Sequence, residues 1–147
     1  MNEILTQLIT AFTGSLGFAL LFHLRRRLLT CASLGGLLSW AVYLAGEWAF
    51  NSIFIACLLA SAFAALYSEI LARLLKAPAT VFFIPTIVPL IPGSTLYYTM
   101  SHAVQNDWPQ AKAYALLTLQ YTLSIAIGIS FVWALFYMLR KIKPRLR

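Results

Sequence analysis

Five long apolar stretches, separated by short polar or basic segments, determine what this chain can fold into. They run near residues 4–22, 28–46, 49–72, 79–104 and 111–139. A membrane-spanning helix needs about 20 mostly apolar residues, and each stretch is close to or above that length. Within lipid the backbone must satisfy its own hydrogen bonds, so helices are the expected form. The sequence therefore predicts an all-α integral membrane bundle of about five transmembrane helices, with residues 1–147 forming a single transmembrane domain.

The composition agrees with that prediction and argues against several function classes. Hydrophobic residues make up 61% of the chain and charged residues only 10%, with a mean hydropathy of +0.82. A soluble domain carries about a quarter charged residues. Cys31 and Cys57 both lie in apolar stretches and are expected to be inert, buried thiols. The sequence offers no nucleophile–base constellation, metal-ligand cluster or glycine-rich phosphate loop, so it predicts neither an enzyme nor a bound metal or cofactor.

The basic residues predict the orientation of the chain in the membrane. If all five stretches cross, only Lys112 of the 11 lysines and arginines falls on one side. The other side carries Arg25, Arg26, Arg27, Arg73, Lys76, Arg140, Lys141, Lys143, Arg145 and Arg147. The positive-inside bias then places the N-terminus outside and the C-terminus in the cytoplasm. Basic residues at the ends of spans are expected to contact anionic lipid head groups, and their placement argues against a nucleic-acid partner.

The second stretch is the weakest of the five, because its segment CASLGG is small and only mildly apolar. Without a crossing there, the triplet at residues 25–27 and the pair Arg73 and Lys76 would fall on opposite sides of the membrane. The charge distribution therefore favours five crossings over four.

Three prolines interrupt the fourth apolar stretch, within the segment FFIPTIVPLIPGSTLYY. Each proline removes a backbone donor and pushes the preceding residue away from helical angles. With Pro85, Pro89 and Pro92 so close together, two half-helices are expected, one near 79–88 and one at about 92–104. The first half-helix would be about 16 Å long, so the second would begin near the middle of the bilayer.

This break has a functional interpretation, because non-helical backbone at such depth is tolerated only inside protein or beside water. The N-terminus of the second half-helix would present free N–H groups and a positive dipole end, which favour an anionic group. Ser94 and Thr95 add hydroxyl groups at the same place. Broken helices at a central site are typical of secondary transporters. The stretch predicts a substrate or ion site, with a proline-kinked packing helix as the alternative.

Small residues at helical spacing predict close packing between the helices. The strips are Ala56, Ala60 and Ala64 in the third stretch, Thr10, Gly14 and Gly17 in the first, and Ala32 with Gly36 in the second. The fifth stretch differs, since it carries a polar stripe at helical spacing made of Tyr114, Thr118, Tyr121, Thr122 and Gly128. That stripe either lines a cavity or bonds to neighbouring helices, and the sequence leaves both interpretations open.

The segment VPLIPGSTLYYTM resembles the Pro-x-x-Pro-Gly-x-x-x-Tyr signature of the threonine/serine exporter family, in its short-subunit form. The likeness extends to Gly17–Phe22, to Cys31–Gly36 and to the basic C-terminal tail, so it covers most of the chain. The resemblance implies export of a small anionic or zwitterionic substrate, either succinate or threonine and serine, across the bacterial inner membrane. It also implies a larger multi-span membrane subunit as partner, because fused members of the family have about twice this number of spans.

The resemblance and the helix break together give a set of expected substrate-binding residues: Pro89, Pro92, Gly93, Ser94, Thr95, Tyr97, Thr118 and Tyr121. No Asp, Glu, Lys or Arg falls near the middle of any span, so the partner subunit is expected to supply any group that couples transport to protons. The competing interpretation is a structural or assembly subunit that does not itself transport. It fits the packing strips but leaves the helix break unexplained.

The charge asymmetry predicts where two reporters will be active. A green fluorescent protein fused after Arg147 should fluoresce, and a periplasmic reporter inserted at Asn106 should be active. A dark C-terminal fusion in a stably inserted protein would contradict the five-span topology.

Overall fold

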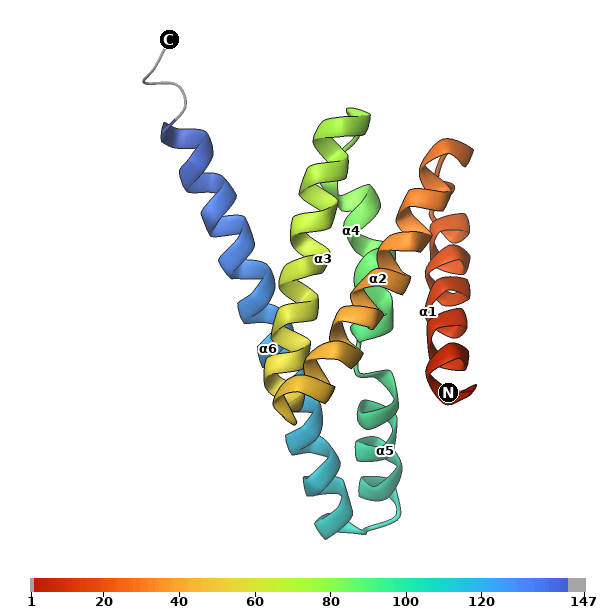
Figure 1. The fold of residues 1–147 in the computed structure, drawn as a ribbon. Coiled ribbons are helices and arrows are strands. Elements are labelled where there is room, and N and C mark those ends of the chain that lie inside the picture. Colours follow the sequence, from red (N-terminus) through yellow and green to blue (C-terminus); the bar gives the residue numbers. More distant parts are fainter. Residues whose placement is uncertain (1, 143–147) are drawn as a thin grey trace.

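The computed structural model describes residues 2–142, and every secondary-structure element in that part of the chain is a helix (Figure 1). The elements are α1 (Asn2–Leu21), α2 (Arg26–Phe50), α3 (Ile53–Leu75), α4 (Ala79–Ile87), the short 3-10 helix η1 (Val88–Leu90), α5 (Gly93–Val104) and α6 (Trp108–Ile142). Of the basic residues that predicted the topology, Lys143, Arg145 and Arg147 lie outside the described residues.

The expected membrane bundle with a broken fourth helix is confirmed. Four of the described helices, α1, α2, α3 and α6, are long and apolar enough to cross a bilayer. The segment Ala79–Leu90 and helix α5 together form a fifth candidate span, bent by 52° at the break between them. The second stretch, the weakest in the sequence, is a helix of 25 residues. Helix α6 is longer than expected, with 35 residues.

The turns sort the charged residues between the two ends of the bundle. The α1–α2 turn, the α3–α4 turn and the C-terminal end of α6 lie at one end in Figure 1, and the N-terminus lies towards the other.

Each of the four turns between the long elements contains one residue with a positive φ: His23, Asn51, Lys76 and Asn106. Asparagine tolerates this left-handed conformation well, and it lets the chain reverse direction within a few residues.

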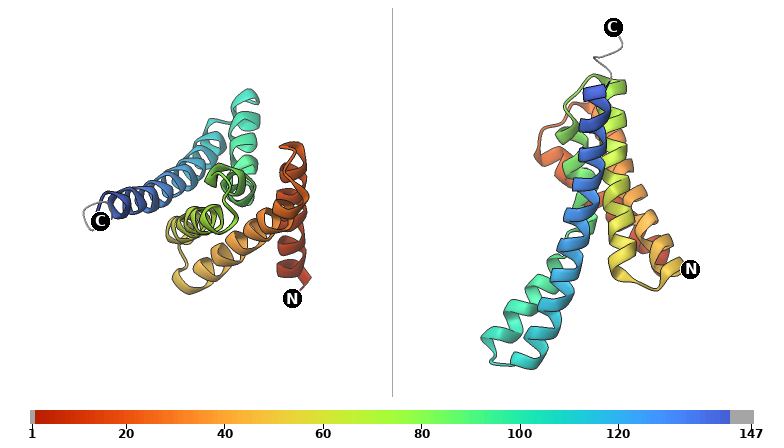
Figure 2. Two further views of the ribbon diagram at one scale, coloured as in Figure 1. Left: turned by 90° about the horizontal axis from the view of Figure 1, so that it is seen from above. Right: turned by 90° about the vertical axis from the view of Figure 1, so that its left-hand side faces the viewer.

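Helix α4 lies at the centre of the bundle, as the view from above in Figure 2 shows. It packs against α2, α3 and α1, and its buried residues are Phe82, Pro85, Thr86 and Ile87. Around it, the strip of Ala56, Ala60 and Ala64 on α3 is fully buried, as its spacing predicted. Ala32 and Gly36 on α2 are also buried, so these small residues allow close helix contacts.

The packing face predicted for α1 was wrong. A side chain added at Gly14 or Gly17 would meet no neighbouring atom within 4 Å, so neither glycine lies in a helix contact. The buried face of α1 is made instead of Ala11, Ser15 and Ala19. Both sets of small residues share nearly the same helical spacing, so the sequence pattern could not tell which of the two faces is buried.

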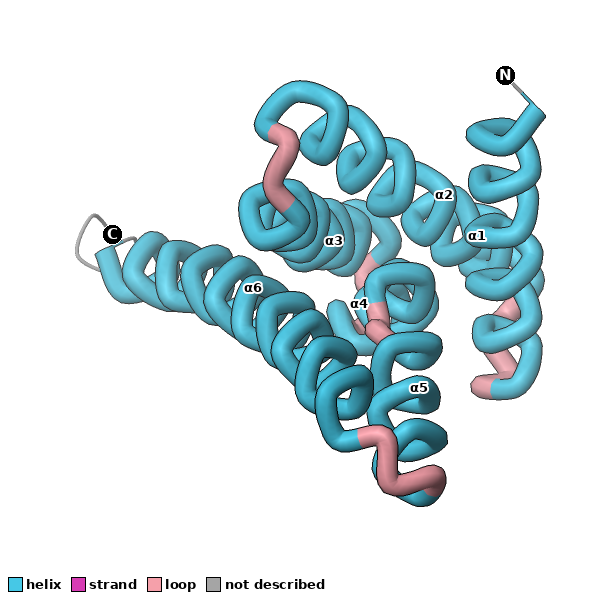
Figure 3. Tube along the Cα trace, turned by 90° about the horizontal axis from the view of Figure 1, so that it is seen from below, coloured by secondary structure: helices cyan, strands magenta, loops and turns pink. Residues whose placement is uncertain are grey.

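Helices α5 and α6 form a hairpin that extends beyond the ends of α1, α2 and α3 (Figure 1). Helix α5 packs mainly on α6, and Figure 3 shows it beside the start of that helix. No residue of α5 is buried within this chain. The hairpin is therefore the least enclosed part of the described structure.

The contact between α3 and α6 depends on a glycine. A Cβ added at Gly128 would lie 2.7 Å from the Leu58 carbonyl oxygen and would also collide with the Ser61 hydroxyl. Because a backbone atom is in the way, Gly128→Ala should force the helices apart and lower the free energy of unfolding by about 1–3 kcal/mol. Thermal unfolding in detergent measures this loss. Gly17→Ala is the matched control and should be neutral or stabilising, because its Cβ would enter open space. Equal losses in both variants would contradict the packing argument.

Candidate functional site

The break between α4 and α5 is built from prolines that withdraw backbone donors. Pro89 has no N–H to donate to the Pro85 carbonyl four residues back, and α4 ends at Ile87. At this end of α4 the Thr86 carbonyl accepts the Ser39 hydroxyl of α2 at 2.8 Å. Pro92 cannot donate to the Val88 carbonyl, which accepts from the Ile91 N–H at 3.2 Å. Ile91 has an extended conformation (φ −66°, ψ 124°), as the residue before a proline should. The chain then enters α5 at Gly93.

Pro85 does not break the helix, contrary to the expectation that each of the three prolines interrupts it. Helix α4 continues through Pro85 to Ile87, and Pro85 is fully buried. Its carbonyl oxygen lies next to Gly36 of α2, where a Cβ would come within 3.3 Å. Thr86 also donates its hydroxyl to the Phe82 carbonyl at 2.8 Å, inside the same turn. Packing on α2 therefore keeps this turn helical although one of its hydrogen bonds is missing.

The break lies against α1, α2 and α3. Pro89 faces Gln7 and Thr10 in the first half of α1, and Leu90 packs in one cluster with Ala56 in the first turn of α3. The first segment passes through Pro85 and continues as a 3-10 helix to Leu90. That the second half-helix begins near the middle of the bilayer stays a prediction.

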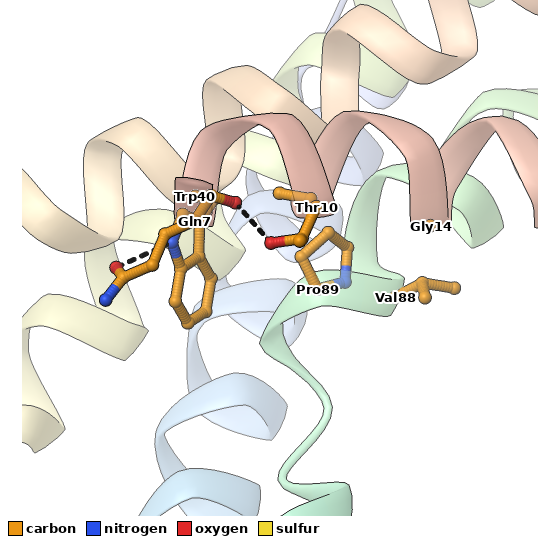
Figure 4. Close-up of a pocket in the computed structure, with 7 residues that line it drawn as sticks. Gln7, Thr10, Gly14, Trp40, Val88 and Pro89 are labelled. Atoms are coloured by element: carbon orange, nitrogen blue, oxygen red, sulfur yellow. Dashed lines mark hydrogen bonds between the residues drawn. The ribbon is translucent and has the colours of Figure 1, made fainter. Parts of the chain in front are cut away.

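A cavity of about 300 Å³ opens beside the break (Figure 4). It is bounded by α1, α2 and the 3-10 helix, and its lining residues are Gln7, Thr10, Ala11, Gly14, Trp40, Val88 and Pro89. Gly14 contributes no side chain, which widens the cavity on the α1 side. The face of α1 that was expected to pack against a helix therefore borders a cavity instead.

Three polar side chains converge on this cavity. The Trp40 indole N–H donates to the Gln7 side-chain oxygen at 3.3 Å, and the Thr10 hydroxyl donates to the Gln7 carbonyl at 2.9 Å. Figure 4 shows these contacts on one side of the cavity, with Pro89 below them. The Gln7 amide group retains N–H donors and the Thr10 oxygen retains acceptor capacity. The lining carries no charged residue, so it can hydrogen-bond a polar ligand without imposing a net charge.

The predicted site residues are spread over several places. Pro89 lines the cavity, and Pro92 is the N-cap of α5 at the break. Thr95 and Thr118 meet between α5 and α6, with hydroxyl oxygens 2.9 Å apart. Tyr121 reaches across to α2, where its hydroxyl lies 3.0 Å from that of Tyr43. The structure therefore does not bring all eight residues around one cavity.

Part of the polar stripe on α6 contacts neighbouring helices, in line with one of the two interpretations left open by the sequence, while the Thr122 hydroxyl bonds within α6. Thr118 contacts Thr95, and Tyr121 contacts Tyr43. Tyr114 lies against the ring of His102, with ring centroids 5.5 Å apart. None of these residues lines the cavity beside Pro89.

The start of α5 is open within this chain. Gly93, Ser94 and Tyr97 are exposed, and a Cβ at Gly93 would meet nothing within 4 Å. The Thr95 hydroxyl, by contrast, donates to the Pro92 carbonyl at 3.2 Å, within the first turn of the same helix. Gly93, Ser94 and Tyr97 therefore face the surroundings of this chain rather than its interior.

Sequence reasoning missed Gln7 and Trp40 as candidate site residues. Gln7 is a polar residue inside the first apolar stretch, and that was the signal available for it. Trp40 gave no such signal, because tryptophan is common in membrane helices for packing reasons alone. Their pairing joins α1 to α2 and becomes visible only in the folded chain.

Comparison with known families gives one match. A family described as Threonine/Serine exporter, ThrE, matches residues 7–135, which include every residue of the cavity and of the break. Comparisons with curated proteins and with solved structures give no match.

The stability of the break can be tested at Ser39. Ser39→Ala would remove the hydroxyl that donates to the buried Thr86 carbonyl at the end of α4, so the free energy of unfolding should fall by about 1–3 kcal/mol. Ser33→Ala is the matched control, because the Ser33 hydroxyl bonds only within its own helix, to the Leu29 carbonyl at 2.8 Å. Thermal unfolding of the two purified variants measures the difference. If Ser33→Ala were as destabilising as Ser39→Ala, the proposed role of the Ser39 hydroxyl would be wrong.

Proposed function

Because the chain belongs to the threonine/serine exporter family, we propose that it is one part of a membrane exporter whose substrate cavity lies beside the break in the fourth span. The observation that carries this proposal is the cavity lined by Gln7, Thr10, Trp40 and Pro89. Ligand sites in transporters are formed where helices are interrupted, since interrupted backbone and nearby polar side chains can both bind a solute.

The chemistry of the lining favours a zwitterionic amino acid over a dicarboxylate. The Gln7 amide, oriented by the Trp40 indole N–H, supplies N–H groups for a carboxylate, and the Thr10 oxygen can accept from an ammonium group. A ligand with no net charge needs no charged partner in the cavity. Succinate would bring two negative charges into a lining without Lys or Arg, at a high desolvation cost. Export of succinate would therefore require cations from another subunit.

We propose a larger membrane subunit as partner, on the grounds of the open face at the break. Helix α5 has no buried residue, and Gly93 and Ser94 point away from the rest of the chain. The first turn of α5 would gain a function if a second subunit closed the space in front of it. In that arrangement the first turn of α5 and the cavity beside Pro89 would lie on two sides of the substrate path.

The proposed location is the bacterial inner membrane, with the basic end of the bundle in the cytoplasm. The described arginines and lysines of the α1–α2 and α3–α4 turns lie at the same end as the C-terminal end of α6, and Lys112 lies at the other. This distribution supports an N-terminus outside and a C-terminus inside.

Vesicle flux separates an exporter from an assembly subunit. The chain would be purified in mild detergent together with the larger subunit, reconstituted into vesicles and supplied with labelled threonine, serine or succinate. Transport of threonine and serine that requires both subunits supports the proposal. An intact complex that transports none of the three compounds would favour the assembly role, and transport of succinate alone would contradict the assignment of a zwitterionic substrate.

If the cavity binds the substrate, substitutions of two threonines in α1 should differ in their effect on apparent substrate affinity. Thr10→Val removes a hydroxyl from the cavity and should weaken apparent substrate affinity by about tenfold, because a hydrogen bond to a charged group is lost. Thr13→Val is the matched control: its hydroxyl bonds to the Ile9 carbonyl of its own helix, and Thr13 does not line the cavity. Concentration-dependent flux of labelled threonine measures both. Equal affinities in the two variants, at equal protein content, would place the substrate elsewhere.

A further inference from the structure

A second hollow, of about 620 Å³, lies at the basic end of the bundle, between the α1–α2 turn and the α3–α4 turn. Its lining residues are Phe22, His23, Leu24, Arg25, Arg27, Leu28, Leu75, Lys76, Ala77, Pro78 and Val81. This hollow is separate from the cavity beside Pro89, with which it shares no residue. It belongs to no part of the transport site described above.

The hollow concentrates positive charge. Arg25, Arg27 and Lys76 line it, and no aspartate or glutamate is among its lining residues. The cations come from two turns that are far apart in the sequence, so the fold brings them together. Lys76 has a left-handed backbone conformation (φ 51°) and ends α3 at this position. Such a cluster favours a ligand with a negative charge, and phosphate is a group that Arg and Lys bind well.

Two helix N-termini open onto the same hollow. Helix α2 begins after Arg25 and α4 begins after Pro78, and neither N-cap makes a side-chain capping hydrogen bond. The Leu28 and Val81 N–H groups donate to the Arg25 and Pro78 carbonyls. The N–H groups before them in each first turn have no acceptor within the helix and carry a partial positive charge. They add to the three cations, so the hollow combines charged side chains with backbone donors suited to an anion.

An apolar groove continues from the hollow along α4. It has a volume of about 150 Å³ and is lined by Phe22, Leu24, Thr80, Val81, Ile84 and Pro85. Phe22, Leu24 and Val81 line both spaces, so the groove starts at the wall of the basic hollow. A free phosphate would leave this groove empty, whereas a hydrocarbon chain attached to the phosphate would fill it.

We propose that this pair of spaces binds one phospholipid with an anionic head group. The phosphate lies among Arg25, Arg27 and Lys76, and an acyl chain follows Val81 and Ile84 down the groove. Basic pockets between membrane helices at the head-group level are a known mode of lipid recognition. The bound lipid would connect the α1–α2 turn to the α3–α4 turn. The proposal does not depend on the transport function.

Native mass spectrometry of the detergent-purified chain, titrated with phosphatidylglycerol, tests the proposal by counting retained lipids. We expect one tightly retained phosphatidylglycerol. Each of Arg25→Gln, Arg27→Gln and Lys76→Asn should weaken its retention by about fivefold, from roughly 1 kcal/mol for each basic residue near an anionic head group. Asparagine is chosen at Lys76 because it tolerates the left-handed conformation there.

Arg26→Gln is the matched control, because Arg26 has the same charge and lies between two of the cations but does not line the hollow. It should retain the lipid nearly as well as the parent. An equal loss in Arg26→Gln would show diffuse attraction to the basic end and would overturn the proposal.

Two further ligands identify what is bound. Phosphatidylcholine, which has a phosphate but no net charge, should be retained at least tenfold less well than phosphatidylglycerol. Glycerol 3-phosphate, which has the phosphate without acyl chains, should not compete at matched concentration. Equal retention of phosphatidylcholine, or full competition by glycerol 3-phosphate, would contradict a specific anionic-lipid site. Melting curves of each variant confirm that the protein is folded.

Discussion

The backbone donors that proline removes from the fourth span are the constraint on which the rest of the bundle depends. An unpaired carbonyl inside a membrane costs several kcal/mol, so carbonyls at the end of the interrupted helix need donors from elsewhere. The Thr86 carbonyl accepts from the Ser39 hydroxyl, and the Val88 carbonyl accepts from the Ile91 N–H. The first of these bonds requires α2 to lie within hydrogen-bonding distance of α4. The break and the packing of α2 on α4 are therefore one structural unit.

Two adjacent glycines on α2 make that close approach feasible. A Cβ at Gly35 would collide with the Thr86 hydroxyl and with the Tyr67 ring, and a Cβ at Gly36 would collide with Ser15. Helices α1, α3 and α4 thus all meet α2 at this point. Since α1 is held close by the same contact, its next turns towards the N-terminus border the break and complete the cavity. The position of that cavity follows from the packing of two residues that have no side chains.

The features that could be predicted from the sequence are those governed by local chemistry. Pro89 and Pro92 withdraw donors wherever they stand, so a break in the fourth span followed from the sequence alone. The buried face of α1 did not follow, because Gly14 belongs to one of two small-residue strips with nearly equal spacing, and only the folded bundle distinguishes them. The pairing of Gln7 with Trp40 is likewise a tertiary contact between two helices, which no local pattern encodes.

Because α6 is much longer than α1, the two sides of the molecule extend over different lengths across the membrane. At about 1.5 Å per residue, the 20 residues of α1 extend about 30 Å and the 35 residues of α6 about 52 Å. The hydrocarbon layer is about 30 Å thick, so α1 matches it and α6 exceeds it. Lipids beside α6 and α5 would have to stretch or the helices would have to tilt, at a cost that grows with each ångström of mismatch. Covering that taller side with another protein relieves the mismatch, so hydrophobic thickness alone favours association there.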